Sequence, residues 1–168
     1  MTKVKRNVMT WQRRAAATVL VGLVGLVVAG CGGGNDDNGN ADKQLSHTAL
    51  VARANSLCRA ATSGVTKVPP ASSLEALADY ASDVATISGR LHADLARLTP
   101  PARDRVTYNR YLEALATSNE QLSAMQRAAQ DGDDGGVRTA VSKIVGADVG
   151  LAAANAGFGL CAAATPVS

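Results

Sequence analysis

Residues 74–98 repeat apolar side chains at alternating intervals of three and four positions, a period that strongly constrains the fold. The repeat consists of Leu74, Leu77, Ala81, Val84, Ser88, Leu91, Leu95 and Leu98. This spacing places the side chains along one side of an α-helix, where another helix must cover them. Ser72 and Glu75 fit a capping box at its start, and Thr99-Pro100-Pro101 prevents its continuation. The pattern predicts a long helix within a helical bundle.

Three other segments have helical periodicity, and no segment shows the alternation of a β-strand. They span residues 46–62, about 102–129 and 137–155. Their apolar faces carry Leu50, Ala54, Leu57, Cys58 and Ala61 in the first, Tyr108, Tyr111, Leu115, Ser118, Leu122, Met125 and Ala129 in the second, and Val137, Val141, Ile144, Val145, Val149 and Ala152 in the third. A glycine-containing break is expected over residues 155–160. Four amphipathic helices with short connections predict an all-α fold, an antiparallel four-helix bundle over residues 46–168.

The N-terminus has the organisation of a secretory signal. Residues 1–14 carry five basic residues and no acid, and residues 15–28 form an uncharged run of 14 residues, shorter than the roughly 20 that span a bilayer. The following Val28-Ala29-Gly30-Cys31 resembles the bacterial lipobox. The resemblance implies a signal peptide over residues 1–30, cleavage between Gly30 and Cys31, and diacylglycerol on the Cys31 sulfur. An uncleaved membrane anchor and a free cysteine are the alternatives, and Arg13-Arg14 leaves Sec or Tat export open.

The remaining chain, Cys31 to Ser168, predicts an exported protein held at the outer face of the cell membrane. Gly32–Asn40 contains only Gly, Asn and Asp, which cannot bury apolar surface, so residues 31–45 are expected to form a flexible linker. The mature chain has 12 basic and 14 acidic residues, a net charge of −2. This charge predicts no nucleic-acid partner. The predicted partner is the membrane, reached through lipid on Cys31, while an envelope protein or a small ligand stays open as a second.

Cys58 and Cys161 are left as an even pair once Cys31 is assigned to lipid. Exported proteins meet oxidising conditions, which favour a disulfide between such a pair. Alanine supplies many inward positions and buries little apolar area, so a bridge between the first and last helices would add a large share of the stability. A redox or metal role is the alternative, although the chain contains no C-x-x-C motif.

Few residues predict a metal, a cofactor or catalysis. His47 and His92 are the only histidines, and neither belongs to a Glu-x-x-His motif. The loop Asp131–Gly136 begins like an EF-hand, but Gly135 and Ser142 occupy two ligand positions. An Asp133 or Asp134 cap for the last helix explains the loop better. We therefore predict no metal, no cofactor and no enzymatic activity.

Tyr108 and Tyr111 are weak candidates for ligand binding, because Arg103, Arg105 and Arg110 lie near them in the sequence. Aromatic and guanidinium groups together can form a polar recognition face. The alternative is that both tyrosines belong to the core and that the arginines are solvated.

Several short motifs of the mature chain together resemble a group of small exported lipoproteins of unknown function from high-GC, mainly actinobacterial, genomes. The motifs are the lipobox, Ala54-Asn55-Ser56-Leu57-Cys58, Leu95-Ala96-Arg97-Leu98-Thr99-Pro100-Pro101 and Gly159-Leu160-Cys161. The resemblance bears on fold and location and implies no activity. We therefore expect a membrane-anchored, non-enzymatic binding or interaction module, with a structural spacer or envelope-maintenance lipoprotein as the alternative.

Overall fold

The structure is a computed structural model of the 168-residue chain, and it describes residues 44–163. The predicted signal peptide (residues 1–30), its cleavage site at Gly30 and Cys31, and the linker up to residue 43 lie outside the described residues. Residues 164–168 also lie outside them.

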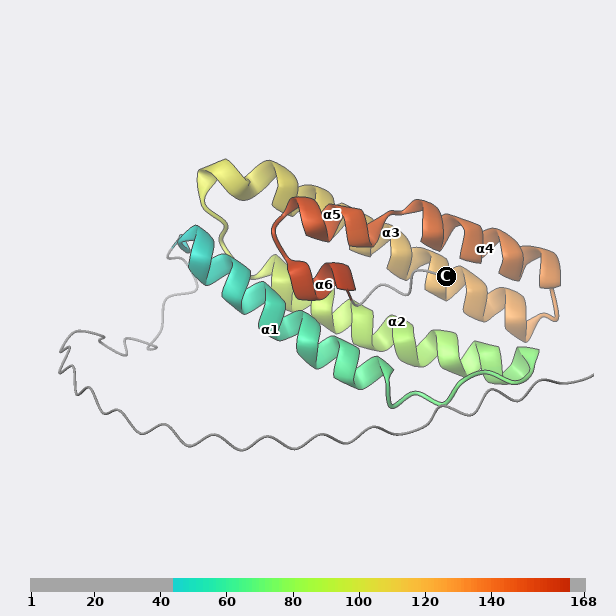
Figure 1. Ribbon diagram of the computed structural model, residues 1–168. Helices are drawn as coiled ribbons and strands as arrows, with labels where there is room; N and C mark the ends of the chain where they lie inside the picture. The colour runs from blue at the N-terminus through green and yellow to red at the C-terminus, as the bar shows by residue number, and fades with distance from the viewer. Residues whose placement is uncertain (1–43, 164–168) are drawn as a thin grey trace, which may run out of the picture. The chain divides into compact units, whose positions relative to one another are not determined.

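The described part of the chain is all α-helical, which confirms the predicted fold class. Its elements are α1 (His47–Val65), α2 (Leu74–Ala96), the short 3₁₀ helix η1 (Ala102–Asp104), α3 (Arg105–Gln130), α4 (Asp134–Gly146), α5 (Val149–Asn155) and α6 (Gly159–Ala163), drawn in Figure 1. Within residues 44–163, no helix combines the length and the hydropathy needed to cross a membrane.

An antiparallel hairpin of α2 and α3 forms the centre of the fold. Leu95, near the end of α2, packs with Tyr108 near the start of α3, whereas Ala81 packs with Met125 near its end. All seven side chains predicted for the inner face of α3 are buried. The face of α2 is less completely covered, since Ala81 and Leu95 are its only predicted core positions that are buried.

Two hydrophobic clusters occupy opposite ends of this hairpin. The larger one joins α1, α5 and α6 to the hairpin and contains Leu50, Cys58, Leu95, Phe158 and Cys161 among its members. The smaller one joins α4 to the hairpin through Ala81, Leu122, Met125 and Ala140. Helix α1 covers only part of α2, because its end at Gly64 lies against Ile87 in the middle of α2.

The fourth predicted helix is interrupted, so the single helix expected over residues 137–155 was wrong. Helix α4 ends at Gly146, and α5 begins at Val149. Between them Asp148 adopts the left-handed conformation, with φ 46° and ψ 39°, which an α-helix cannot contain. As a result α4 packs on the far half of α3, α5 packs on its first half, and α6 returns to α1. The predicted break after Asn155 is confirmed, with Gly157 at φ 80°.

The N-terminus of α2 is capped one residue later than the predicted capping box. The Ser73 hydroxyl accepts a hydrogen bond from the Ala76 backbone N–H at 3.1 Å. Ser73 is therefore the N-cap, and Glu75 lies one position too early to complete a capping box with it. Ser72 and Ser73 are both residues that can cap a helix, so the sequence alone does not choose between them. The packing of Leu77 and Ala81 against α3 and α4 decides where the helix begins.

We expect Ser73→Ala to lower the free energy of unfolding by about 1 kcal/mol, because it removes the acceptor for a backbone N–H at the helix start. Ser72→Ala is the matched control and should leave stability nearly unchanged. Urea unfolding followed by circular dichroism measures both. A larger loss from Ser72→Ala would show that the capping assignment is wrong.

Candidate binding groove

Cys58 and Cys161 form the predicted disulfide. Their sulfur atoms are bonded and their Cα atoms lie 5.1 Å apart, across 103 residues of sequence. A hydrogen bond from the Leu160 backbone N–H to the Asn55 side-chain oxygen (3.1 Å) lies beside the bridge. The bond therefore fastens α6, at the end of the described chain, to the middle of α1.

Tyr108 and Tyr111 lie in the core, where the two residues are 2% and 1% exposed. Both rings meet Phe158 edge-on, with centroid separations of 6.0 and 5.5 Å. The Tyr108 hydroxyl donates to the Leu95 carbonyl oxygen, and the Tyr111 hydroxyl lies 3.4 Å from the Cys58 sulfur. In this conformation neither ring is accessible to a ligand. Their placement fits the alternative interpretation, in which both are core tyrosines.

Burial raises the pKa of Tyr108 to about 12. It also raises the pKa of Tyr111, to which the neighbouring Tyr108 adds. The unfolded chain ionises its tyrosines near pH 10, whereas the native state keeps these two protonated. Stability should therefore be complete below about pH 10 and fall as pH rises toward the native pKa values.

The expected result is a lower free energy of unfolding at about pH 11 than at about pH 8. Urea titrations at the two pH values measure the difference. Tyr108→Phe should reduce it, because the phenylalanine cannot ionise in the unfolded chain. Equal stability at both pH values would contradict the burial of these hydroxyls.

The histidines and the aspartate-rich loop form no evident metal centre. The His47 Nδ1 lies 2.9 Å from an Asp104 carboxylate oxygen, and this pair joins the start of α1 to η1. Asp133 stands at the N-cap position of α4, without a side-chain capping hydrogen bond. Within residues 44–163, no three His, Cys, Asp or Glu side chains are grouped so that they could hold a metal ion.

A groove of about 390 Å³ lies between the first half of α3 and the junction of α4 with α5. It is lined by Thr107, Arg110, Ala114, Ala147, Asp148, Leu151, Ala152 and Asn155. Alanines provide an apolar lining, and Leu151 at the groove is 60% exposed. Val145 lies two residues before Ala147, in the last turn of α4, and is 62% exposed. Half of the lining residues are apolar and half are polar, so the groove can contact both kinds of group in a ligand.

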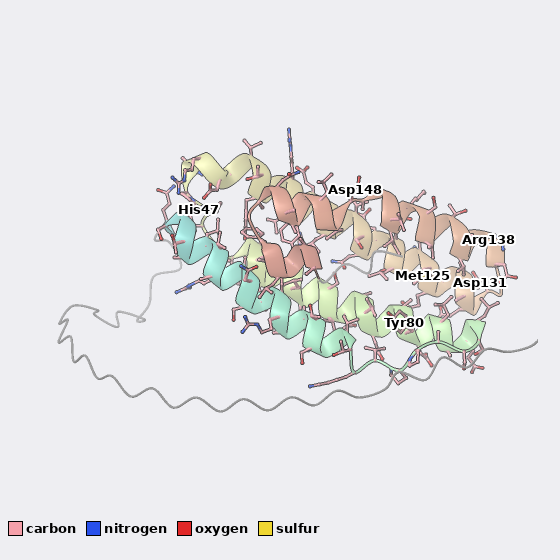
Figure 2. All side chains as sticks on the ribbon, in the orientation of Figure 1. His47, Tyr80, Met125, Asp131, Arg138 and Asp148 are labelled. Carbon is pink, nitrogen blue, oxygen red and sulfur yellow. A yellow bond between two sulfur atoms is a disulfide. The ribbon has the colours of Figure 1, made fainter. Side chains whose placement is uncertain are left out.

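The groove also presents charged groups without protein partners. Among residues 44–163, the side chains of Arg110, Asp148 and Asn155 make no ion pair or hydrogen bond with another residue. Asp148 lies at the junction of α4 and α5 (Figure 2). One cationic, one anionic and one amide group are therefore available beside apolar surface.

Asp148 is the only residue other than glycine with a positive φ in the described part of the chain. Backbone strain of this kind is often found at functional sites. Here it ends one helix and turns the next one against α3, so it determines the shape of the groove. Sequence reasoning missed the groove, although Gly146 followed by Asp148 was a local signal for a helix end.

We expect Asp148→Gly to raise the free energy of unfolding by about 0.5 kcal/mol, because relief of left-handed strain outweighs the added flexibility of the unfolded chain. Ala147→Gly is the matched control. Ala147 is right-handed, so glycine there should lower stability by about 0.5–1 kcal/mol. Urea unfolding distinguishes the two, and changes of the same sign would contradict the strain assignment.

A second hollow, also of about 390 Å³, lies between the end of α1 and α6. Its lining consists of Arg59, Thr62, Ser63, Thr66, Leu160 and Ala163. Ala163 is the last residue that the structure describes, whereas every residue of the Asp148 groove lies well inside the described range. The groove at Asp148 is therefore the better-defined candidate.

Comparison of the chain with protein-family models, with curated proteins and with solved structures gives no match. The candidate groove therefore rests on its own geometry.

Proposed function

We propose that this protein is an exported, lipid-anchored binding or interaction module without enzymatic activity. The proposal combines the lipobox-like sequence at Cys31 with one structural observation, the groove that presents unpartnered Arg110 and Asp148 beside apolar side chains. Opposite charges beside apolar surface suit a small ligand or peptide segment that carries both charged and apolar groups.

The chemistry of the groove supports binding over catalysis. Arginine stays protonated at all physiological pH values and cannot serve as a general base. The lining contains no histidine, cysteine or lysine, and its one carboxylate, Asp148, has no nucleophile beside it other than the Thr107 hydroxyl. That hydroxyl donates to the Asp104 carbonyl oxygen at 3.0 Å. No nucleophile and base stand together as covalent catalysis requires.

The anchoring part of the proposal is tested at the N-terminus. Mass spectrometry of the N-terminal peptide, purified from host membranes, should find acylated Cys31 as the first residue. Cys31→Ser should release the protein from the membrane fraction. An unmodified Cys31, or a Cys31 still joined to Gly30, would exclude lipid anchoring.

The binding part is tested by native mass spectrometry of the protein purified from its own envelope. A reproducible adduct is expected. Arg110→Gln and Asp148→Asn should each reduce its occupancy, because they remove the charges that would hold it. Arg59→Gln in the second hollow is the matched control and should retain it. A protein mass without adduct in every preparation would favour the spacer alternative.

A further inference from the structure

The charged residues of the described chain are separated along the helix axes. Residues 44–163 contain eleven basic and eleven acidic side chains and therefore carry no formal net charge. One end of the hairpin, defined as residues 44–53 and 90–110, carries six arginines and two aspartates, a formal charge of +4. These are Arg53, Arg90, Arg97, Arg103, Arg105 and Arg110, with Asp94 and Asp104. We call this the basic end.

The opposite end, defined as residues 74–83 and 120–138, carries seven carboxylates and two arginines, a formal charge of −5. They are Glu75, Asp79, Asp83, Glu120, Asp131, Asp133 and Asp134, with Arg127 and Arg138. We call this the acidic end. Figure 2 shows His47 at the basic end, with Asp131 and Arg138 at the other end of the molecule. The domain is neutral but has a strong charge asymmetry.

The arginines of the basic end are displayed to solvent. All six are exposed. Arg97 contacts Asp94 at 3.3 Å and Arg103 contacts Asp104 at 3.7 Å, yet these two arginine side chains remain 77% and 71% exposed. Exposed pairs of this kind are weak, so they leave Arg97 and Arg103 available to an external anion.

The chain from Cys31 joins the domain at this same basic end. The Leu45 backbone N–H donates to the Thr99 carbonyl oxygen at 2.9 Å, and the Gln44 side-chain amide donates to the Pro100 carbonyl oxygen at 3.4 Å. Gln44 comes thirteen residues after Cys31. Thirteen residues span at most about 45 Å even when fully extended. A lipid on Cys31 would therefore keep the basic end within that distance of the membrane surface.

We propose that the basic end rests on the anionic phospholipid headgroups of the anchoring membrane and that the acidic end points away from it. This inference rests on the proposed anchoring through Cys31. Attraction of arginines to anionic headgroups acts within about 8 Å at physiological salt. Repulsion of the seven carboxylates from the same surface favours the same orientation. The Asp148 groove shares Thr107 and Arg110 with the basic end, so it would then lie close to the membrane surface.

The orientation can be read with single tryptophans, because the chain's one tryptophan, Trp11, precedes the predicted cleavage site. Ala102→Trp places a probe at the basic end, and Gln130→Trp places one at the acidic end; both positions are exposed. Each lipidated mature protein is reconstituted into vesicles of phosphatidylcholine, alone or with roughly a third phosphatidylglycerol. A spin label on the lipid headgroups quenches the fluorescence of a nearby tryptophan.

The Ala102→Trp probe should be quenched at least twofold more in anionic than in neutral vesicles, and the Gln130→Trp probe should not. Combined Arg97→Gln, Arg103→Gln and Arg105→Gln should remove the difference. Combined Arg127→Gln, Arg138→Gln and Lys143→Gln removes the same charge elsewhere and should retain it. About 0.5 M salt should abolish it without any substitution, which keeps the test valid if a triple variant unfolds.

Equal quenching of the Ala102→Trp probe in both vesicle types, or equal loss from both triple variants, would overturn the proposal. Failure of the proposed lipid anchor can be told apart from failure of the headgroup contact, because a protein without lipid would not float with neutral vesicles. If the protein is not lipidated, the two triple variants are compared by flotation on anionic vesicles. Selective loss for the basic-end triple would still support the headgroup contact. Absence of any flotation would overturn it, as would a preference for a soluble polyanion over the vesicles.

Discussion

Replacing both Cys58 and Cys161 by serine should lower the free energy of unfolding by about 2–5 kcal/mol. The bridge closes a loop across 103 residues, so its loss restores a large amount of freedom to the unfolded chain. Alanines supply three of the eleven buried residues of the larger hydrophobic cluster and two of the four of the smaller one, so part of the core buries little apolar area to offset this loss. Urea unfolding at neutral pH, followed by circular dichroism, measures the change.

Cys31→Ser is the matched control for the double replacement, since it removes a cysteine that takes no part in the bridge. Its unfolding midpoint should equal that of the unmodified protein when both are measured without lipid. A double serine variant with an unchanged midpoint would mean that packing of α6 alone holds the end of the domain.

The folding pattern was most predictable where a helix is covered along its whole length. The 3-4 repeat of α3 identified seven inner positions, and all seven are buried, because α2 follows α3 along its length while α5 and α4 cover its first and second halves. The same repeat in α2 was a weaker guide. Leu77 and Val84 are only partly buried, since α1 ends beside Ile87 and leaves the first half of α2 less covered.

The last helix was mispredicted because its apolar pattern continues across the break. Val145 and Val149 are spaced as in a single helix, yet the left-handed Asp148 separates them. Tertiary packing decides this point, since α5 is turned to pack against α3 while α4 follows the other cluster. Local periodicity contains no information about such a change of partner.

The disulfide was predictable from the cysteine count, whereas the groove was not. Its lining comes from α3 and from residues about 40 positions later, and each residue is ordinary by itself. For Tyr108 and Tyr111 the sequence supported two interpretations, a recognition face and a place in the core. They occupy successive inner positions of the α3 repeat, so their periodicity already indicated burial, and proximity to arginines in sequence did not make them a surface site.

Phe158 packs the turn between α5 and α6 against α3. We expect Phe158→Ala to lower the free energy of unfolding by roughly 3–5 kcal/mol. Phe158 is fully buried, and its ring is the common partner of Tyr108 and Tyr111. Edge-to-face pairs add to the stabilisation that burial alone provides. Removing the ring would therefore leave a cavity between α3 and the α5–α6 turn, and would change the near-ultraviolet circular dichroism of both tyrosines.

Leu160→Ala is the matched control for Phe158→Ala, because Leu160 lies two residues later and is 40% exposed. It should cost about 1 kcal/mol or less. Phe158 and Cys161 both hold α6 in place, so their contributions should not be independent. When Cys58 and Cys161 are both replaced by serine, α6 is no longer held by the disulfide and the Phe158 ring has less native packing to lose. In that background Phe158→Ala should therefore lower the free energy of unfolding by less than it does in the unmodified protein. Strict additivity in urea unfolding would mean that Phe158 and the disulfide stabilise separate parts of the domain.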